Sequence, residues 1–182
     1  MKNILVALEG LSATGKTTVG KIVAQRIKGA FYKTPPKLFR GPFRDEVDRY
    51  AGTMARLLFY LAGITQASEE ISQILTRQSV ICDRYLLTTL CYHRALGVSI
   101  DISNSIFTSL VQPDFVFLLV SEEKIRLERL QNRGLSFNDE QERQDGFEKK
   151  LSMEYMRHNL IQVDNSNDKP NLVAEKIMTY FL

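Results

Sequence analysis

Residues 4–17 read ILVALEGLSATGKT and contain, at residues 10–17, the complete phosphate-loop pattern GxxxxGK[ST]. The pattern requires a strand that aims the loop and a helix that receives it, because backbone N–H groups of the loop and of the helix N-terminus together hold phosphate oxygens. Residues 4–8 form the short aliphatic run of a buried strand, and apolar residues from Val19 to Ile27 recur at helical spacing. Both flanks disfavour the alternative, a chance glycine-rich turn.

Each part of the loop has a role in holding a nucleotide phosphate. Gly10 and Gly15 allow backbone conformations and close approaches that a Cβ would block. Lys16 is expected to neutralise the terminal phosphates of ATP, and Thr17 to place a hydroxyl on Mg²⁺. The residues expected to bind the nucleotide are Gly10, Ser12, Ala13, Thr14, Gly15, Lys16, Thr17 and Thr18.

Length and composition bound the kind of protein. With 182 residues, 44% of them hydrophobic and 25% charged, residues 1–182 have the size and composition of one soluble globular domain. No apolar stretch approaches the roughly 18 residues of a membrane-spanning helix, and no signal peptide is visible, so a cytoplasmic protein is expected. The net charge of +3 is well below that of a dedicated nucleic-acid-binding surface. Cys82 and Cys91 lack metal-ligand spacing and are expected to be free thiols.

Short apolar strands alternate with helices along the chain, which predicts an α/β fold whose parallel sheet is covered by helices on both faces. We expect the strands at residues 4–8, 30–33, 79–82, 115–120 and 160–163. After the first helix we expect one or two helices over 44–64, broken near Gly52, then helices over 67–77, 86–96, 103–111, 122–133, a segment ending near 159, and 172–181. Residues 135–144 read as a polar segment between two of these helices.

An acid and a base follow the third strand. In parallel sheets ligands bind beyond the carboxyl ends of the strands, and the first and third strands end at Glu9-Gly10 and Asp83-Arg84. Asp83 is suited to hold Mg²⁺ or its waters, and Arg84 to hold a phosphate group. A surface ion pair is the alternative, but the neighbouring phosphate loop favours a catalytic site at this edge.

Several segments carry a resemblance to a known family: ALEGLSATGKTT, ICDRYLLTTLCYHRALG, QPDFVFLLVSEEKIRLERLQNRG and the polar stretch that follows. They resemble the thymidylate kinase family of P-loop nucleoside monophosphate kinases over most of the chain, and the Asp-Arg-Tyr segment at 83–85 is the part that points to this family. The resemblance implies a P-loop three-layer α/β/α sandwich with a five-stranded parallel sheet and a flexible lid at about 134–145. It implies transfer of the γ-phosphoryl group of ATP to the 5′-phosphate of a deoxynucleotide, with dTMP or a related nucleotide as the small-molecule partner. Homodimers are usual in the family, and the apolar helix over 54–64 is either an interface or core.

The resemblance also implies roles for individual residues. Lys16 and Thr17 would bind the phosphates and Mg²⁺, while Asp83 and Arg84 would organise the metal and the acceptor phosphate. Phe59 would lie near the acceptor base, where stacking and plain core packing are equally good readings. Tyr92 and His93 would lie near the nucleotide. The alternative for His93 is a solvent-exposed histidine on the surface of a helix.

Arginines of the segment before and within the lid are candidates for stabilising the charge of the transferred group. Arg133, next to Gly134, is the preferred candidate, and Arg143 lies within the lid segment. Arg129 lies on the same helix face as Arg133. The many charged residues of this helix, Arg126 among them, predict a solvent-exposed face instead, which is the alternative interpretation for Arg129.

The chain departs from the family pattern at the acceptor site. Ser12 stands where the phosphate loop of the family usually has an acid, Ala13 where it has glycine, and Thr34 replaces a second acid. An arginine associated with thymine recognition has no counterpart in residues 61–64. The acids that would compensate are Glu9, Asp45, Glu46 and Asp48.

Two other functions stay open. A kinase for a nucleoside or another small-metabolite hydroxyl would use the same loop, metal and lid, but it would need a carboxylate base near that hydroxyl. A phosphorylated acceptor needs extra cations instead, which Lys33, Arg40, Arg44 and Arg84 would supply. The third reading is a nucleotide-binding switch without kinase activity, although the guanine-reading Asn-Lys-x-Asp motif of GTPases is absent from the sequence.

Overall fold

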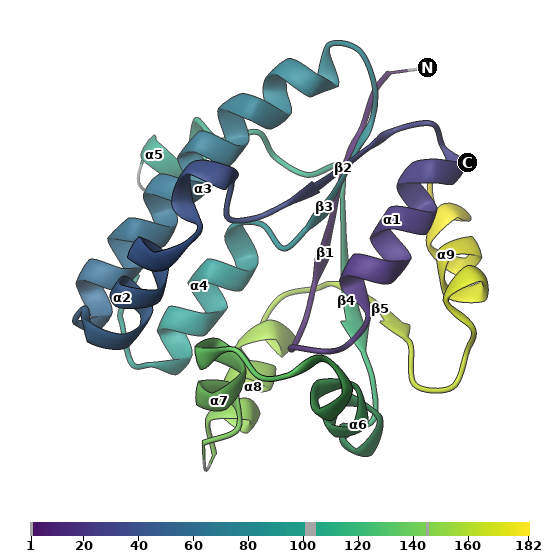
Figure 1. Ribbon diagram of the computed structural model, residues 1–182. Coiled ribbons are helices and arrows are strands. Elements are labelled where there is room, and N and C mark those ends of the chain that lie inside the picture. The colour runs from purple at the N-terminus through teal and green to yellow at the C-terminus, as the bar shows by residue number, and fades with distance from the viewer. Residues whose placement is uncertain (1, 101–104, 145) are drawn as a thin grey trace.

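A computed structural model describes residues 2–100, 105–144 and 146–182. Five parallel strands form one sheet in the order β2-β3-β1-β4-β5 (Figure 1). The strands are β1 Leu5–Glu9, β2 Ala30–Lys33, β3 Val80–Asp83, β4 Phe115–Val120 and β5 Ile161–Asp164. The predicted five-stranded α/β fold is therefore confirmed, with each strand within one residue of its predicted position, and β1, which leads into the phosphate loop, is the central strand.

Helices cover both faces of the sheet. One face carries α1 and α9, and the other carries α3, α4 and α8 (Figure 1). The helices are α1 Lys16–Arg26, α2 Pro42–Tyr50, α3 Thr53–Leu75, α4 Leu86–Ala95, α5 Ser105–Thr108, α6 Glu123–Arg133, α7 Phe137–Glu142, α8 Phe147–Met156 and α9 Pro170–Met178, with a short 3₁₀ turn over Lys37–Phe39. Within the described residues no helix combines the length and the apolar character needed to cross a membrane.

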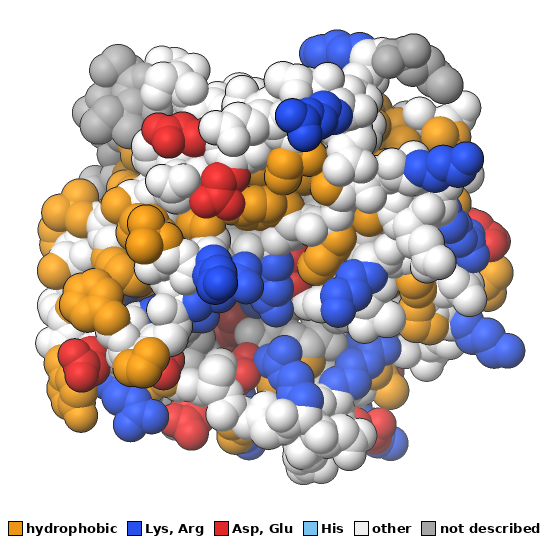
Figure 2. All heavy atoms as spheres, turned by 45° about the horizontal axis from the view of Figure 1, so that its top comes forward, with side chains coloured by type: hydrophobic (Ala, Val, Ile, Leu, Met, Phe, Trp, Pro, Cys, Tyr) orange, Lys and Arg blue, Asp and Glu red, His pale blue; other side chains and the backbone are white. Residues whose placement is uncertain are grey.

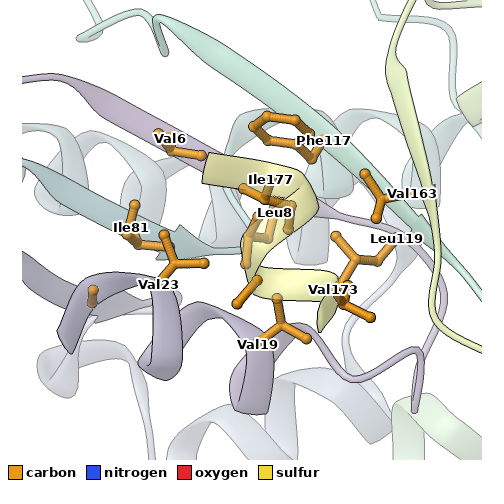
Figure 3. Close-up of a cluster of buried hydrophobic side chains, with 12 residues drawn as sticks. Val6, Leu8, Val19, Val23, Ile81, Phe117, Leu119, Val163, Val173 and Ile177 are labelled. Atoms are coloured by element: carbon orange, nitrogen blue, oxygen red, sulfur yellow. The ribbon is translucent and has the colours of Figure 1, made fainter. Parts of the chain in front are cut away.

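The central strand β1 is buried on both faces, and its first four residues, 5–8, are all apolar. Val6 and Leu8 pack into the cluster beneath α1 and α9 (Figure 3). Leu5 and Ala7 point to the opposite face, where they meet the buried side of α3. Because a strand buried on both faces has no solvent side, its sequence does not alternate with polar residues.

Most predicted boundaries agree with the structure to within three residues, but two predicted helix assignments differ from it. The second helix expected within 44–64 and the helix expected over 67–77 form one continuous helix, α3. The expected break near Gly52 separates α3 from α2. Gly63 lies inside this helix without breaking it, and a Cβ there would lie 3.3 Å from the ring of Phe39. The predicted helix over 103–111 falls partly on residues outside the described part of the chain, and α5 occupies its middle.

The polar segment over 135–144 contains a helix, α7, which the sequence reading did not assign. Ser136 caps it: the Ser136 hydroxyl accepts from the backbone of Asp139, and the Asp139 carboxylate accepts from the backbone N–H of Ser136. This reciprocal capping box was readable from the Ser-x-x-Asp spacing, but the polar composition of the segment concealed it.

Gly10 fixes the exit of the chain from β1. Its φ is +130°, and a Cβ there would lie 2.4 Å from the carbonyl oxygen of Leu119 in β4. We expect Gly10→Ala to lower the free energy of unfolding by about 2–5 kcal/mol, the sum of backbone strain and overpacking. Gly41→Ala is the matched control, because Gly41 also has positive φ (+89°) but no described atom lies within 4 Å of its Cβ position. Urea denaturation of both variants checks the difference, and equal losses would show that contact with β4 is unimportant.

Candidate active site

The carboxyl ends of β1 and β3 lie side by side, as predicted. Leu8 is paired with Asp83 in the sheet, and the backbone N–H of Arg84 donates to the Leu8 carbonyl at 3.0 Å. The Thr17 hydroxyl, at the start of α1, donates to the Asp83 carboxylate. The sheet thus brings the phosphate loop and the acid-base pair, 66 residues apart in sequence, into direct contact.

The phosphate loop wraps around its own lysine. The Lys16 ammonium donates to the carbonyl oxygens of Gly10 (3.0 Å) and Leu11 (2.5 Å) and to the Thr14 hydroxyl (3.1 Å). Burial, with the nearby charge of Arg84, lowers the pKa of Lys16 to about 7. An anionic phosphate beside the ammonium would restore its full charge, so the loop is arranged to receive an anion.

Three side chains support the loop from outside. Asn165 donates to the Thr14 carbonyl at 2.7 Å, and Arg129 donates to the Ala13 carbonyl at 3.2 Å. Arg126 donates to the Ser12 carbonyl at 3.4 Å and pairs with Glu148 of α8.

This arrangement corrects the reading of α6 as a charged solvent face. Arg126 is only 2% exposed, and Arg129 is half-buried with its guanidinium against the loop. Such burial of an arginine carries no local sequence signal, because its acceptors come from the phosphate loop and from α8.

A cavity of about 870 Å³ lies over this edge of the sheet. In Figure 2, Lys and Arg side chains gather around a hollow near the middle of the face shown. The predicted site residues that line the cavity are Ser12, Ala13, Gly15, Lys16, Thr17, Thr18, Lys33, Arg44, Asp83, Arg84, Tyr92, His93 and Arg133. The predicted residues outside its lining are Gly10, Thr14, Arg40, Phe59 and Arg143. Of these, Gly10 and Thr14 still contact Lys16, which lines the cavity.

Arg40, Phe59 and Arg143 do not take the places expected of them. Arg40 bonds to the backbone carbonyls of Lys33 and Pro35 and is otherwise exposed. Arg143 is exposed, beyond the end of α7. Phe59 is half-buried among neighbouring aromatic rings, with ring centres 5.4 Å from Phe39 and 5.8 Å from Phe43. It lies outside the cavity lining, whereas the next residue, Tyr60, lines the cavity.

Arg84 presents a fixed positive charge to the cavity. Burial alone would lower the pKa of its guanidinium, but acidic groups around it, Tyr155 and Glu142 foremost, raise the pKa above the ordinary arginine value. Its nitrogens lie 3.4 Å from the hydroxyls of Ser12 and Thr88 and 3.8 Å from the Glu142 carboxylate. These separations are long for hydrogen bonds, so the guanidinium retains capacity for a ligand.

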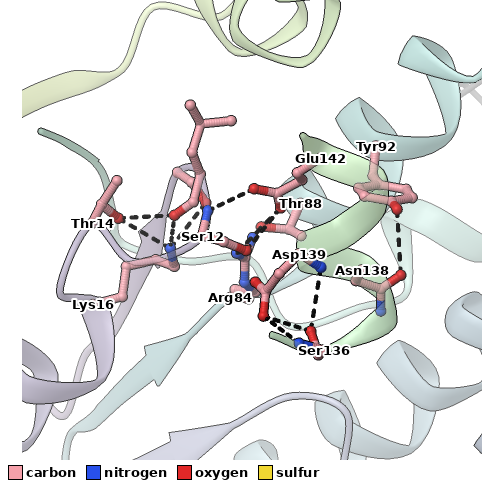
Figure 4. A network of polar contacts seen from close by, with 12 residues as sticks. Ser12, Thr14, Lys16, Arg84, Thr88, Tyr92, Ser136, Asn138, Asp139 and Glu142 are labelled. Carbon is pink, nitrogen blue, oxygen red and sulfur yellow. Dashed lines mark hydrogen bonds and ion pairs between the residues drawn. The ribbon is translucent and has the colours of Figure 1, made fainter. Parts of the chain in front are cut away.

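Glu142 of α7 is the acid that sequence reasoning missed. Its carboxylate accepts from the backbone N–H (2.9 Å) and from the hydroxyl (3.0 Å) of Ser12, the position where an acid was expected in the loop (Figure 4). A carboxylate therefore lies beside the loop, although it comes from the predicted lid 130 residues away.

The four acids proposed to compensate do not line the cavity. Burial raises the pKa of Glu9, whose carboxylate accepts from the Tyr85 backbone and the Thr88 hydroxyl and so secures the start of α4. Asp48 is also buried, where it accepts from Tyr60, while Asp45 and Glu46 are exposed.

One face of α7 ties the predicted lid to the far side of the cavity. Asn138 donates to Asp48 of α2 at 3.1 Å. Gln141 accepts from Arg56 of α3 at 2.8 Å and from the Tyr92 hydroxyl of α4 at 2.9 Å. With Glu142, these residues recur at i, i+3 and i+4, the spacing of one helix face.

His93 is a buried residue, not a solvated one: it is 2% exposed. Burial lowers the pKa of its imidazole to about 4. The unfolded chain would bind a proton below about pH 6.5, whereas the folded chain does not bind it until about pH 4. Stability is therefore lost as the pH falls through this window, since the unfolded state binds more protons there.

We expect His93→Gln to flatten the pH dependence of stability. The group contributes a slope of at most about 1.4 kcal/mol per pH unit between about pH 6.5 and pH 4. Urea denaturation of the wild type and the variant between about pH 7 and pH 5 measures the difference in slope, and His158, kept in both proteins, does not affect it. Parallel curves would show that folding does not lower the pKa of His93.

A phosphate loop at the end of a central parallel strand, an acid-base pair at the end of its neighbour and a polar helix over the cavity define a P-loop kinase. The chain belongs to the thymidylate kinase family: the sequence model described as thymidylate kinase matches residues 8–177. It is a nucleotide kinase.

Relatives and solved structures agree with this assignment. The chain is 28% identical to a probable thymidylate kinase of Methanocaldococcus jannaschii, over 98% of this chain and 95% of the relative. It is 34% identical to human mitochondrial UMP-CMP kinase 2 over 84% of this chain. The matched region covers only 36% of the human protein. The fold is similar to that of Candida albicans thymidylate kinase (TM-score 0.75, 16% identity, 98% of this chain and 91% of the other). It is also similar to that of deoxyadenosine kinase of M. mycoides with bound dATP (TM-score 0.73, 18% identity, 98% of each chain). The fold alone is therefore shared by nucleotide and nucleoside kinases.

Proposed function

We propose that the protein transfers the γ-phosphoryl group of ATP to the 5′-phosphate of a deoxynucleoside monophosphate, with dTMP as the first candidate. The observation that carries this proposal is the placement of Arg84, whose fixed charge lines the same cavity as Lys16 and retains capacity for a ligand. Lys33 and Arg44 line the cavity as well. A second phosphate group, on the acceptor, needs cations beyond those of the phosphate loop.

The carboxylates of the cavity support a phosphorylated acceptor over a nucleoside. Among the described residues, the acids that line it are Asp83, Asp139 and Glu142. Asp83 accepts from Thr17, Asp139 caps its own helix at Ser136, and Glu142 accepts from Ser12. A nucleoside kinase needs a carboxylate free to take the proton of the 5′-hydroxyl, and each of these is engaged.

Thr17 and Asp83 fit a magnesium ion as the partner of ATP. A hydroxyl and a carboxylate are the oxygen donors that Mg²⁺ prefers, and the two already meet at the mouth of the phosphate loop. Bound there, the ion would neutralise charge on the ATP phosphates.

In the proposed reaction an oxygen of the acceptor phosphate forms a bond to the γ-phosphorus, while the bond from that phosphorus to the β–γ bridging oxygen breaks and ADP leaves. Lys16 neutralises the donor phosphates, and Arg84 holds the acceptor phosphate in line. Residues 134–144, with α7, act as the lid of a single kinase domain, and Arg133 at its edge adds charge to the transferred group. Closure of the lid excludes water, the competing acceptor.

We also propose a homodimer formed through α3. Leu57 and Ile64 of this helix are buried in the core, whereas Met54 and Leu58 are exposed. An exposed apolar helix face suits burial against a second copy. Sedimentation of the purified protein as a monomer would contradict this part of the proposal.

A second candidate acceptor is UMP or CMP. The similarity to human UMP-CMP kinase 2, 34% over 84% of this chain, is the observation that favours it. The cavity departs from the thymidylate kinase pattern at Ser12 and Thr34, so the choice of base is open to experiment.

ADP release from Mg·ATP tests these functions with one panel of acceptors. The panel contains dTMP, dUMP, dCMP, dGMP, UMP, CMP and AMP, with the matching nucleosides as a parallel set. Stimulation by dTMP supports the proposal, and stimulation only by UMP or CMP supports the second candidate. Stimulation only by a nucleoside would overturn the phosphorylated acceptor. ADP release that no acceptor raises would leave a nucleotide-binding switch as the better reading.

A further inference from the structure

Arg56 of α3 is a buried cation without a paired acid. The residue is only 5% exposed. Among the described residues, no carboxylate forms an ion pair with it, and its Nε has no hydrogen-bond partner. Asp48 offers Arg56 a backbone carbonyl at 3.3 Å, while the Asp48 carboxylate pairs with Arg44 of α2 at 3.4 Å. A guanidinium stays charged when it is buried, and a buried charge without a counter-ion is costly. The neutral acceptors around Arg56 must therefore offset that cost.

The shorter hydrogen bond of Arg56 extends to the predicted lid. Its Nη1 donates to Oε1 of Gln141, in α7, at 2.8 Å. Because a guanidinium only donates, the amide of Gln141 must present its oxygen here. The Tyr92 hydroxyl of α4 donates to the same oxygen at 2.9 Å, and Figure 4 shows this hydroxyl directed at α7. The Arg56 guanidinium also lies 5.3 Å from the centre of the Tyr92 ring. One oxygen atom of α7 thus joins the lid helix to both α3 and α4.

Arg56 lies behind the cavity wall. Tyr92 lines the cavity, whereas Arg56 and Gln141 are outside its lining. Movement of α7 away from the cavity would take the Gln141 oxygen with it and leave the buried guanidinium with the more distant carbonyl of Asp48. Hydrogen bonds to charged groups are stronger than those between neutral groups, and a charged donor left unpaired is costly. The contact therefore favours the closed position of α7 before any nucleotide binds.

We propose that Arg56 is a positioning residue of the kinase, which holds Gln141 and so keeps helix α7 closed over the cavity and the Tyr92 side chain fixed in its wall. The inference rests on the proposed function, in which residues 134–144 act as the lid. Arg56 acts through Gln141 and Tyr92 and needs no contact with a substrate. Its removal should let bound acceptor leave faster, which raises KM, while the phosphate loop and its chemistry stay in place.

Hydrogen exchange of the protein without nucleotide tests the contact directly. We expect Arg56→Leu, which keeps an apolar stem but removes every donor, to speed exchange of the backbone amides of α7 about 10-fold. The amides of α9, on the opposite face of the sheet, should exchange as in the wild type. Arg77→Leu is the matched control, because it removes an exposed arginine just beyond α3 and outside the cavity lining. Equal exchange of α7 in the wild type and in Arg56→Leu would overturn the inference.

Gln141→Glu gives a prediction of opposite sign. A carboxylate at this position can accept from both Arg56 and Tyr92, as the amide oxygen does, and it adds a charge opposite to that of the guanidinium. We expect the amides of α7 to exchange more slowly than in the wild type. This variant keeps Arg56, so the test does not depend on the folding of Arg56→Leu. Exchange as fast as in the wild type, or faster, would contradict a role of Arg56 that passes through Gln141.

Steady-state kinetics connect the contact to catalysis. With the acceptor found by ADP release, we expect Arg56→Leu to raise the acceptor KM about 10-fold and to change kcat by less than about 2-fold. Arg56→Lys retains a buried cation that donates, and it should restore most of the wild-type KM. A loss of kcat with an unchanged KM would overturn the positioning role. If no acceptor raises ADP release but α7 responds as expected in hydrogen exchange, the proposed function fails while the contact between α3 and α7 stands.

Discussion

Lys16→Ala is expected to lower kcat for phosphoryl transfer by about 100- to 1,000-fold, the usual loss when one group that stabilises transition-state charge is removed. The Lys16 ammonium is held at the centre of the loop by the oxygens of Gly10, Leu11 and Thr14. It is therefore preorganised where charge develops on the transferred group. Steady-state kinetics with saturating Mg·ATP and acceptor measure the loss.

The matched control for this variant is Lys149→Ala, which removes an exposed lysine of α8 outside the cavity. It should turn over at the wild-type rate. Circular dichroism and thermal unfolding establish that both variants are folded. Wild-type turnover by a folded Lys16→Ala protein would remove the phosphate loop from the mechanism.

The second large effect is expected from Arg84→Ala, which should raise KM for the phosphorylated acceptor about 10- to 150-fold and KM for ATP much less. Loss of one charge-assisted phosphate contact costs about 1.5–3 kcal/mol, which corresponds to this range. Initial rates with each substrate varied in turn separate the two constants. Equal increases in both KM values would assign Arg84 to the donor site or to the fold.

Backbone strain at this position needs its own control. Arg84 has φ = +67°, in the left-handed region that alanine adopts only at a cost. Arg84→Gly removes the same charge but suits that backbone. We expect the glycine variant to match the alanine variant in its acceptor KM and to exceed it in stability by about 1 kcal/mol. A kinetic loss confined to the alanine variant would point to strain as its cause.

The parts of the site that the sequence predicted are those built from contiguous residues. A strand, a glycine-rich loop and a helix form one local unit, so Lys16 and Thr17 could be placed from residues 4–27 alone. Asp83 was predictable because the rule that parallel strands end at the same edge supplies the long-range step.

The parts that the sequence did not predict depend on pairs brought together by packing. Glu142 meets Ser12 across 130 residues, and no local pattern predicts that helix α7 places a carboxylate there. Arg126 is buried because the Ser12 carbonyl and Glu148 accept from it, partners that its own helix does not reveal. Phe59, expected either near the acceptor base or in the core, packs against neighbouring aromatic rings outside the cavity lining, and Tyr60 lines the cavity.

If residues 134–144 act as the proposed lid, the position of Glu142 makes the charge of the site depend on the position of that lid. A carboxylate in the phosphate loop would be permanent, whereas this one belongs to α7 and would leave with it whenever the lid opens. The open site would then be more positive by one unit and would attract anionic nucleotides more strongly from solution. On closing, the returning carboxylate would lower the net positive charge of the site by one unit, so the proposed movement would change the charge of the site as well as its access to water.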